Sequence, residues 1–315
     1  MDRPRLVVTM GDPAGVGPEL CLRLFTEEAP DFDADLTIFG SDKVLSDVSL
    51  ATGLPLGGDL YDFGPVDDLL PGHVSAHTGT AAHRYLTNAI EATRTGHFDG
   101  IVTAPISKEA LALAGVPHPG HTEILVEATG SDRHAMMLTA PDITCSLVTT
   151  HCALAEVPGL LSTARILEVI TLTADAMRRL RDHPPRLAIL GLNPHAGEAG
   201  LFGNEEAAII QPAVDAARDQ GIDITDPLPA DTAFLPARRD ETDAYVCMYH
   251  DQGLIPLKTL AYDRAVNVTL GLPLVRTSVD HGTALDIAWD AIADPSSLYA
   301  AVELAAQLAR SSQSS

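Results

Sequence analysis

Lysine is scarce in this chain: Lys43, Lys108 and Lys258 are the only three among 315 residues, and arginine supplies the other basic side chains. Acidic residues exceed basic ones, and the formal net charge is -23 at pH 7. A protein with this excess of negative charge repels nucleic acids and anionic lipid surfaces. We therefore expect neither of these as a partner. The acidic composition fits a high-salt habitat and a GC-rich genome about equally well.

Cysteine is also scarce, and the chain has no long apolar run. The four cysteines, Cys21, Cys145, Cys152 and Cys247, are too few and too scattered for a disulfide framework. No segment reaches the roughly 18 apolar residues of a membrane-spanning helix, and the N-terminal apolar run, 6–10, is too short for a signal peptide. We therefore expect a cytoplasmic protein with reduced thiols.

Short apolar segments rich in β-branched residues alternate with amphipathic segments of helix length. Strands are predicted over 5–10, 35–40, 100–104, 143–150, 186–192, 244–249 and 265–270. Helices are predicted over 18–29, 80–95, 107–114, 122–129, 163–181, 204–220 and 296–310. This alternation is typical of an α/β protein with a mostly parallel sheet covered on both faces, and the length favours about two domains.

Three of the predicted strands lead into a histidine: His151, His195 and His250. Because ligands bind outside the carboxyl ends of parallel strands, we expect the three side chains at one edge of the sheet. Imidazole suits zinc and related ions, and three ligands leave a coordination position open for substrate. The spacings match no local metal motif, so the pattern alone leaves a metal site and structural histidines equally open. Asp231 could be a fourth ligand or a hydrogen-bond partner of one.

Three further features could bind an anion. The glycine-rich loop 11–17 joins a strand to a helix, where backbone amides favour negative groups, although a tight structural turn is the commoner explanation for such a loop. His121 and Thr122 open another predicted helix and could both donate to a phosphate. Around the strand 265–270 lie Lys258, Asn267 and Arg276, which could bind an anion or be solvated surface groups.

Eight segments carry a resemblance to a known family. They are GDPAGVGPEL, TAPISK, GHTEIL, TTHCAL, LNPHAGE, PLPADTAF, YHDQGLIPLK and VNVTLGLPLVRTSVDHGTA. In this order they are very similar to the 4-hydroxythreonine-4-phosphate dehydrogenase family of vitamin B6 biosynthesis, over essentially the whole chain. The resemblance implies the fold of isocitrate and isopropylmalate dehydrogenases, a two-domain α/β/α subunit that forms a homodimer with its active site in the interdomain cleft. We expect one domain from 1–125 and 280–315 with the nucleotide loop, and a central domain, 126–279, with the metal site and dimer interface.

The resemblance also implies roles for individual residues. A divalent ion (Zn²⁺, Mg²⁺ or Co²⁺) would be bound by His151, His195 and His250, the last of them from the partner subunit. The phosphorylated substrate would be held by His121, Thr122, Lys258, Asn267 and Arg276. The general base would be Lys258 or Asp231.

The segment 280–288 resembles the nucleotide loop of these dehydrogenases. The cofactor would be contacted there by Gly282, Thr283, Ala284 and Asp286. The family usually continues with Ala-Gly and a basic residue, where this chain has Trp289 and Asp290. Trp289 could reshape the adenosine pocket, and Asp290 would repel a 2′-phosphate. We therefore expect NAD rather than NADP.

The implied reaction is an NAD-dependent and metal-dependent oxidation, with decarboxylation, of 4-phosphooxy-L-threonine to 3-amino-2-oxopropyl phosphate. An alternative is a paralogous 4-phospho-D-threonate or 4-phospho-D-erythronate dehydrogenase of sugar-acid catabolism, which would use the same groups. Comparing rates on the phosphorylated substrates distinguishes the two. A more distant alternative, an acyltransferase or a phosphate-binding module on a related fold, predicts no reduction of NAD with any of these substrates.

Overall fold

The computed structural model describes residues 3–261 and 264–313, and the chain divides into two compact units. Unit 1 is formed by Met1–Asp132 and Leu272–Ser315, and unit 2 by Arg133–Gly271. Both unit boundaries lie outside helices and strands. The domain boundaries predicted after residues 125 and 279 would instead fall within helix α5 and at the end of strand β11.

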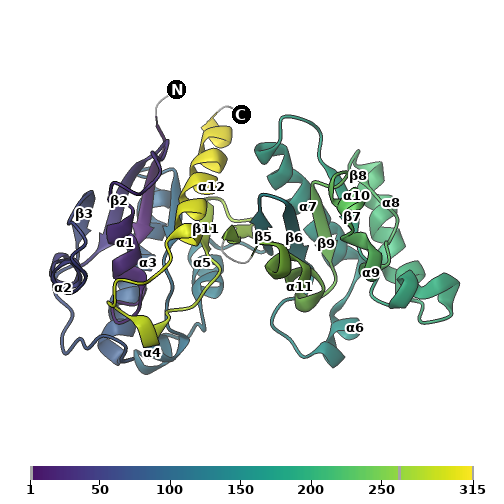
Figure 1. The fold of residues 1–315 in the computed structure, drawn as a ribbon. Helices are drawn as coiled ribbons and strands as arrows, with labels where there is room; N and C mark the ends of the chain where they lie inside the picture. Colours follow the sequence, from purple (N-terminus) through teal and green to yellow (C-terminus); the bar gives the residue numbers. More distant parts are fainter. Residues whose placement is uncertain (1–2, 262–263, 314–315) are drawn as a thin grey trace. The chain divides into compact units, whose positions relative to one another are not determined.

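Unit 1 contains a parallel sheet with the strand order β3-β2-β1-β4-β11. The strands are β1 (Arg5–Thr9), β2 (Asp35–Gly40), β3 (Asp59–Asp62), β4 (Gly100–Thr103) and β11 (Val275–Val279). The helices are α1 (Gly17–Arg23), α2 (Asp42–Thr52), α3 (Ala76–Arg94), α4 (Lys108–Leu113), α5 (His121–Thr129) and α12 (Ser296–Gln313), with a short 3₁₀ turn, η5 (Leu285–Ile287). Consecutive residues of β4 and β11 are all buried although they point to opposite faces, so both faces of this sheet are covered. Helices α3 and α12 pack against its central strands (Figure 1).

Unit 2 has the strand order β10-β5-β6-β9-β7-β8, in which β5 is antiparallel to both neighbours and the other pairs are parallel. The strands are β5 (Ala135–Ala140), β6 (Ile143–Leu147), β7 (Arg186–Ile189), β8 (Asp223–Ile224), β9 (Ala244–Cys247) and β10 (Val266–Leu270). The α-helices are α6 (Val157–Leu160), α7 (Thr163–Leu180), α8 (Gln211–Asp219), α9 (Ala230–Ala233), α10 (Pro236–Arg239) and α11 (His250–Ala261). Shorter turns are η1 (Leu154–Glu156), η2 (Pro194–Gly200) and the π-turn η3 (Glu206–Ile210). Helices α7 and α11 pack against its central strands.

Serine side chains determine where four of these helices begin. In each case the serine oxygen accepts a hydrogen bond from the backbone N–H three residues later, which satisfies a donor that the first helical turn leaves unpaired. The capping residues are Ser41, Ser75, Ser107 and Ser162, before α2, α3, α4 and α7. Ser75 and Thr78 form a reciprocal capping box, so α3 begins at Ala76 rather than at the predicted residue 80.

The predicted α/β class with a mostly parallel sheet is confirmed. His250 is the first residue of α11, a helix that the sequence did not predict. Gly253 and Pro256 resemble turn signals, yet Gly253 lets the helix lie directly on the sheet. A Cβ at this glycine would lie 2.9 Å from Cys247 Sγ and 3.1 Å from Cys145 Cβ.

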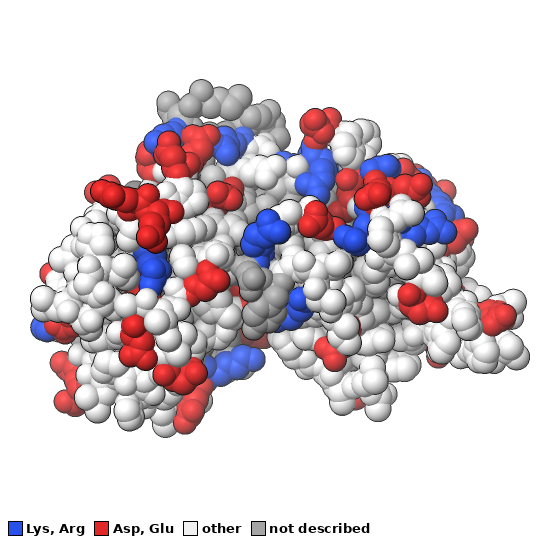
Figure 2. All heavy atoms as spheres, in the orientation of Figure 1, with Lys and Arg blue, Asp and Glu red and all other residues white. Residues whose placement is uncertain are grey.

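Within the described ranges, no single helix is long and apolar enough to cross a membrane. The helices over Leu154–Leu160 and Thr163–Leu180 reach the required length and composition only as a pair, bent by 95°. Figure 2 shows acidic side chains spread over the face in view, with basic ones scattered among them.

We predict that Gly253→Ala destabilises the protein by about 1–3 kcal/mol, because the added methyl group overpacks the contact between α11 and strands β6 and β9. Urea unfolding monitored by circular dichroism measures the change. Gly159→Ala is the control, since a Cβ there meets no atom within 4 Å and should leave stability unchanged or slightly raised. Equal stabilities of the two variants would contradict the packing explanation.

Candidate active site

Three neighbouring parallel strands of unit 2, in the order β6-β9-β7, end at the same edge of the sheet. His151 follows β6 in an irregular segment, and its side chain is exposed. His250 follows β9 as the first residue of α11. His195 follows β7 within η2. All three candidate metal ligands therefore lie just beyond the carboxyl ends of adjacent strands.

Two of these histidines lie side by side in the single chain. The ring centroids of His151 and His250 are 5.5 Å apart. Two imidazoles bound to one tetrahedral zinc ion through bonds of about 2.1 Å would have centroids about 5 Å apart, so this spacing is compatible with a shared ion. The Nδ1 atom of His250 is 2.7 Å from Asp251 Oδ1, a contact that would orient the ring and leave Nε2 for an ion.

His195 does not join this pair within one chain. Over residues 3–261 and 264–313, no group of three His, Cys, Asp or Glu side chains is arranged to hold a metal ion. The ring of His195 instead lies 6.1 Å from that of Phe202, measured between centroids. A three-histidine site would therefore need a ligand from outside the single chain or a change in the position of this turn.

The backbone around His195 is left-handed. From His195 to Ala199, every φ is positive, between 42° and 80°, although only Gly197 lacks a side chain. A residue with a Cβ pays roughly 1–2 kcal/mol for this conformation. Such strain persists only where the surroundings impose it, and it is concentrated at functional sites.

Glu206 is the residue that braces this turn. Its carboxylate is buried and accepts hydrogen bonds from the backbone N and from Nδ2 of Asn193, at 2.7 and 3.1 Å. A Cβ at Gly197 or Gly191 would lie 2.6 or 3.1 Å from one of its oxygens. Only glycine at these two positions therefore lets the turn close on the carboxylate.

Two further buried side chains connect the loops that carry the histidines. Gln252 accepts from Met248 N at 2.6 Å and donates to Gly191 O at 2.7 Å, which joins the end of β9 to that of β7. Thr149 donates from its hydroxyl to Met248 O at 2.8 Å, which joins the segment after β6 to that after β9. The sequence prediction missed Gln252, Thr149 and Glu206. A polar residue beside strongly apolar strands was the available signal for them.

The other unit 2 candidates lie on elements next to the histidines. Lys258 is half-buried in α11, the helix that His250 begins, and Asn267 is half-buried in β10. Asp231 is exposed in α9, which packs against the turn η2 that contains His195. Each candidate general base is thus connected through its element to one candidate metal ligand.

In unit 1, two groups that can carry positive charge lie close together: Arg276 is buried and His121 is half-buried. Arg276 in β11 is 3% exposed and donates from Nη2 to Thr103 Oγ1 at 2.8 Å. Burial lowers its pKa to about 10. His121 begins α5, and its Nε2 is shielded from solvent with no hydrogen-bond partner among the residues described. Burial, followed by the charge of Arg276, holds the pKa of His121 well below its usual 6.5.

These two residues fit an anion. A negative group beside them would supply a partner for His121 Nε2 and would lie at the N-terminus of α5, where the helix dipole also favours negative charge. Thr122, half-buried, is the second residue of this helix. Lys108 also lies nearby, because a Cβ at Gly120 would be 3.9 Å from its Cε atom. The sequence prediction did not include Lys108. The scarcity of lysine in this chain was a signal that could have pointed to it.

The loop 11–17 could bind an anion or be a tight structural turn, and the structure supports the turn. All seven residues are buried, and several of its amides are already bonded within the protein: Gly15 N donates to Asp12 O, and Val16 N donates to Thr283 O. The Asp12 carboxylate accepts from Ala14 N at 3.0 Å, and burial raises its pKa. The loop therefore supports its neighbours and has no open cradle for an anion.

The four candidate cofactor contacts lie on one segment between β11 and α12. A Cβ at Gly282 would meet no atom within 4 Å, so the space beside it is open. Thr283 bonds through its carbonyl to the loop 11–17, and Ala284 has φ 42°. Asp286 is exposed in η5. The segment thus offers accessible backbone and a carboxylate next to a buried support.

Comparison with known proteins identifies the family. Residues 39–305 match the family model of the pyridoxal phosphate biosynthetic protein PdxA. The chain belongs to this family. It is 44% identical to a 4-hydroxythreonine-4-phosphate dehydrogenase from Geobacter metallireducens, an alignment that covers 98% of this chain and 96% of the relative.

Solved structures agree with this assignment. A crystal structure of 4-hydroxythreonine-4-phosphate dehydrogenase from Klebsiella pneumoniae superposes with a TM-score of 0.88 at 39% identity and covers 98% of both chains. A β-decarboxylating dehydrogenase from Thermococcus kodakarensis matches with a TM-score of 0.50 at 14% identity, over 96% of this chain and 81% of that one, which shows similarity of fold alone. The predicted family and the resemblance to the isocitrate and isopropylmalate dehydrogenase fold are both confirmed.

We predict that the free energy of unfolding decreases as the pH falls below 6.5, in part because of His121. Its pKa is lowered in the folded protein, so the unfolded chain binds the proton more readily and stability is lost as the pH falls from the unfolded towards the folded pKa. The contribution is at most about 1.4 kcal/mol per pH unit. Urea unfolding between pH 8 and pH 5 should show a weaker dependence for His121→Asn. A slope for His121→Asn equal to that of the wild type would contradict the assignment.

Proposed function

We propose that this protein is an NAD-dependent and metal-dependent 4-hydroxythreonine-4-phosphate dehydrogenase. It oxidises and decarboxylates 4-phosphooxy-L-threonine to 3-amino-2-oxopropyl phosphate, a step of vitamin B6 biosynthesis. The observation that carries the proposal is the 44% identity to an enzyme of this name over 98% of the chain. The geometry adds the buried Arg276 and the shielded Nε2 of His121, which together suit the phosphate of such a substrate.

We assign substrate binding to groups that donate hydrogen bonds to anions. Arg276 offers a planar fork suited to two phosphate oxygens, and His121 offers the unpartnered Nε2. Thr122 adds a hydroxyl at the same helix N-terminus. The complete set of proposed substrate-binding residues is His121, Thr122, Lys258, Asn267 and Arg276.

A divalent ion would be held by His151, His195 and His250, with one of the three supplied by a second copy of the chain. Support for a shared site comes from large apolar side chains that are 46–71% exposed in the segments next to these histidines. They are Leu154, Leu201, Phe202 and Ile255. A second copy that contributes a histidine would also cover these side chains, so the homodimer is part of the proposal.

The chain's own residues would prepare the reaction. When bound, the ion would polarise the substrate hydroxyl and then the ketone, while the nicotinamide would accept the hydride. Asp251 orients the ring of His250, and Glu206 with Asn193 fixes the turn of His195, so that two of the three ligands are held before an ion arrives. Lys258 or Asp231 would remove the hydroxyl proton.

The nucleotide loop would contact the cofactor through Gly282, Thr283, Ala284 and Asp286. Asp286 in this loop and Asp290 just after it are both exposed, and their carboxylates would repel the 2′-phosphate of NADP. NAD is therefore the proposed cofactor. A cytoplasmic location, where NAD is available and thiols stay reduced, completes the proposal; all four cysteines are free in the structure.

We predict that the purified protein, supplied with a divalent ion, reduces NAD when 4-phosphooxy-L-threonine is added and releases CO₂ in equal amount. Absorbance of the reduced nicotinamide and CO₂ release measure the two products. The same panel includes 4-phospho-D-threonate, 4-phospho-D-erythronate and NADP. A higher kcat/KM on 4-phospho-D-threonate or 4-phospho-D-erythronate would replace the proposed substrate. No reduction of either NAD or NADP with any of the three substrates would exclude the dehydrogenase.

We predict that His195→Ala and His250→Ala variants, each inactive and unable to retain the ion, restore activity when their subunits are mixed. If two chains share each site, random exchange yields half heterodimers with one intact site of two, which gives roughly a quarter of wild-type activity. Metal retained after dialysis is measured alongside activity. The controls are the two mixtures that combine His151→Ala with His195→Ala or with His250→Ala. The mixture that fails to restore activity identifies the two histidines that one chain supplies to the same site. Failure of all three pairs would contradict the shared site.

A further inference from the structure

The segment 284–293 of unit 1 contains an unusual number of left-handed residues. Ala284, Trp289 and Ala291 have φ values of 42°, 66° and 64°. Side chains with a Cβ disfavour this region, and a tryptophan there is especially uncommon. The conformation must therefore be imposed by contacts with the rest of the unit.

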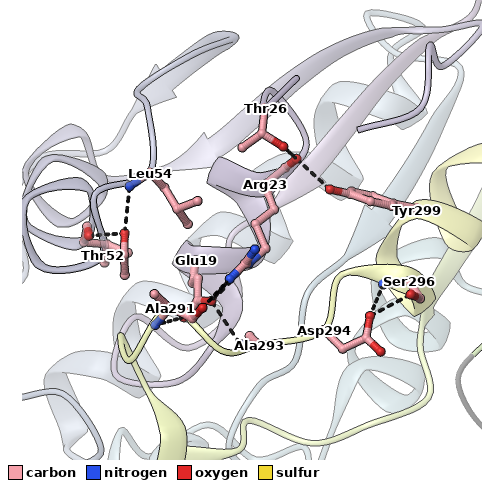
Figure 3. A network of polar contacts seen from close by, with 11 residues as sticks. Glu19, Arg23, Thr26, Thr52, Leu54, Ala291, Ala293, Asp294, Ser296 and Tyr299 are labelled. Atoms are coloured by element: carbon pink, nitrogen blue, oxygen red, sulfur yellow. Dashed lines mark hydrogen bonds and ion pairs between the residues drawn. The ribbon is translucent and has the colours of Figure 1, made fainter. Parts of the chain in front are cut away.

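Glu19 supplies the main contact. It lies in α1, has no solvent exposure, and accepts two hydrogen bonds from Arg23, at 3.0 and 2.8 Å. Its carboxylate also accepts from the backbone N–H groups of Ala291 and Ala293, at 3.2 and 3.0 Å (Figure 3). Arg23 in turn donates to Ala291 O at 2.7 Å. The ion pair thus holds the segment by three backbone groups, and Ile292 between them is turned outward, 65% exposed.

Both ends of the segment are also fixed. Trp289 donates from its indole N–H to Pro13 O at 3.2 Å, and Thr283 O accepts from Val16 N at 3.0 Å. After the segment, Asp294 accepts from the backbone N and the hydroxyl of Ser296, where α12 begins. The cofactor contacts that we propose, 282–286, include the anchor at Thr283 and lie before the anchor at Trp289.

We infer that Glu19 is a positioning residue for the cofactor: it holds the segment 284–293 in its left-handed conformation and so presents residues 282–286 to NAD. The inference rests on the proposed function, because it assumes that this segment binds the cofactor. A carboxylate is required at this position, because all four of its partners are donors. The amide of a glutamine would place its own N–H groups against at least one of them.

The chain's one tryptophan, Trp289, reports on this segment directly. In Glu19→Gln we expect the Trp289 emission to shift to longer wavelength and its quenching by acrylamide to increase, because the segment loosens. We expect the KM and Kd for NAD to rise roughly tenfold, as for the loss of one hydrogen bond to a charged group, with a smaller change in kcat. The KM for the phosphorylated substrate and metal retention should stay at wild-type values. Arg23→Lys, which keeps the charge and loses the fork, should change the same quantities in the same direction by less.

Tyr299→Phe is the matched control. Tyr299 donates to Arg23 O at 2.8 Å within the same network but makes no hydrogen bond to the segment 284–293 (Figure 3). Its removal should leave Trp289 emission and NAD affinity unchanged. An effect equal to that of Glu19→Gln would overturn the inference in favour of a general loosening of α1.

The experiment separates the two levels of the proposal. If the wild-type protein neither binds NAD nor changes its Trp289 fluorescence on NAD addition, the cofactor assignment fails. If the wild type binds NAD and folded Glu19→Gln retains both its emission and its affinity, the positioning role fails while the dehydrogenase stands. If circular dichroism shows that Glu19→Gln does not fold, Trp289 emission and NAD affinity are measured in Arg23→Lys instead. Wild-type values of both in Arg23→Lys would overturn the positioning role of Glu19.

Discussion

The central strands of both units are parallel and buried on both faces, and this burial decides where chemistry can occur. Consecutive residues of β4, β9 and β11 are all buried, so these strands present almost no polar group to solvent along their length. The three candidate metal ligands accordingly lie where the strands end. In unit 2 three such ends, of β6, β9 and β7, lie next to one another and lead into the three histidines.

A backbone confined to a strand end must turn sharply, and two of the turns here are left-handed. One contains His195 and the other contains Trp289. Each is held by a buried glutamate, Glu206 in unit 2 and Glu19 in unit 1. The glutamate accepts hydrogen bonds from backbone N–H groups in the turn or next to it. Because the carboxylate is shielded from water, these hydrogen bonds resist exchange with solvent, and the turn keeps its shape before any ligand binds.

The elements that the sequence predicted well were those with a strong local signal. The strands β2 and β9 and the helices α5 and α7 combine clear apolar periodicity with turn or capping residues at their ends. Strands β5 and β11 were missed, since β5 carries two methionines and β11 carries Arg276 and Thr277, which weaken the apolar pattern. Helix α11 was missed because Gly253 and Pro256 indicate a turn, and only the close packing on β6 and β9 shows why glycine is there.

The sequence alone determined the α/β class, the family and the arrival of three histidines at strand ends, because these depend on local pattern and on long ordered motifs. It left open whether the loop 11–17 binds an anion or is a structural turn, and the buried, already bonded amides of the structure decided for the turn. The roles of Glu19, Glu206 and Gln252 also came only from the tertiary structure. Each joins backbone groups far apart in the chain, and no local pattern records which carbonyl or amide a buried side chain will meet.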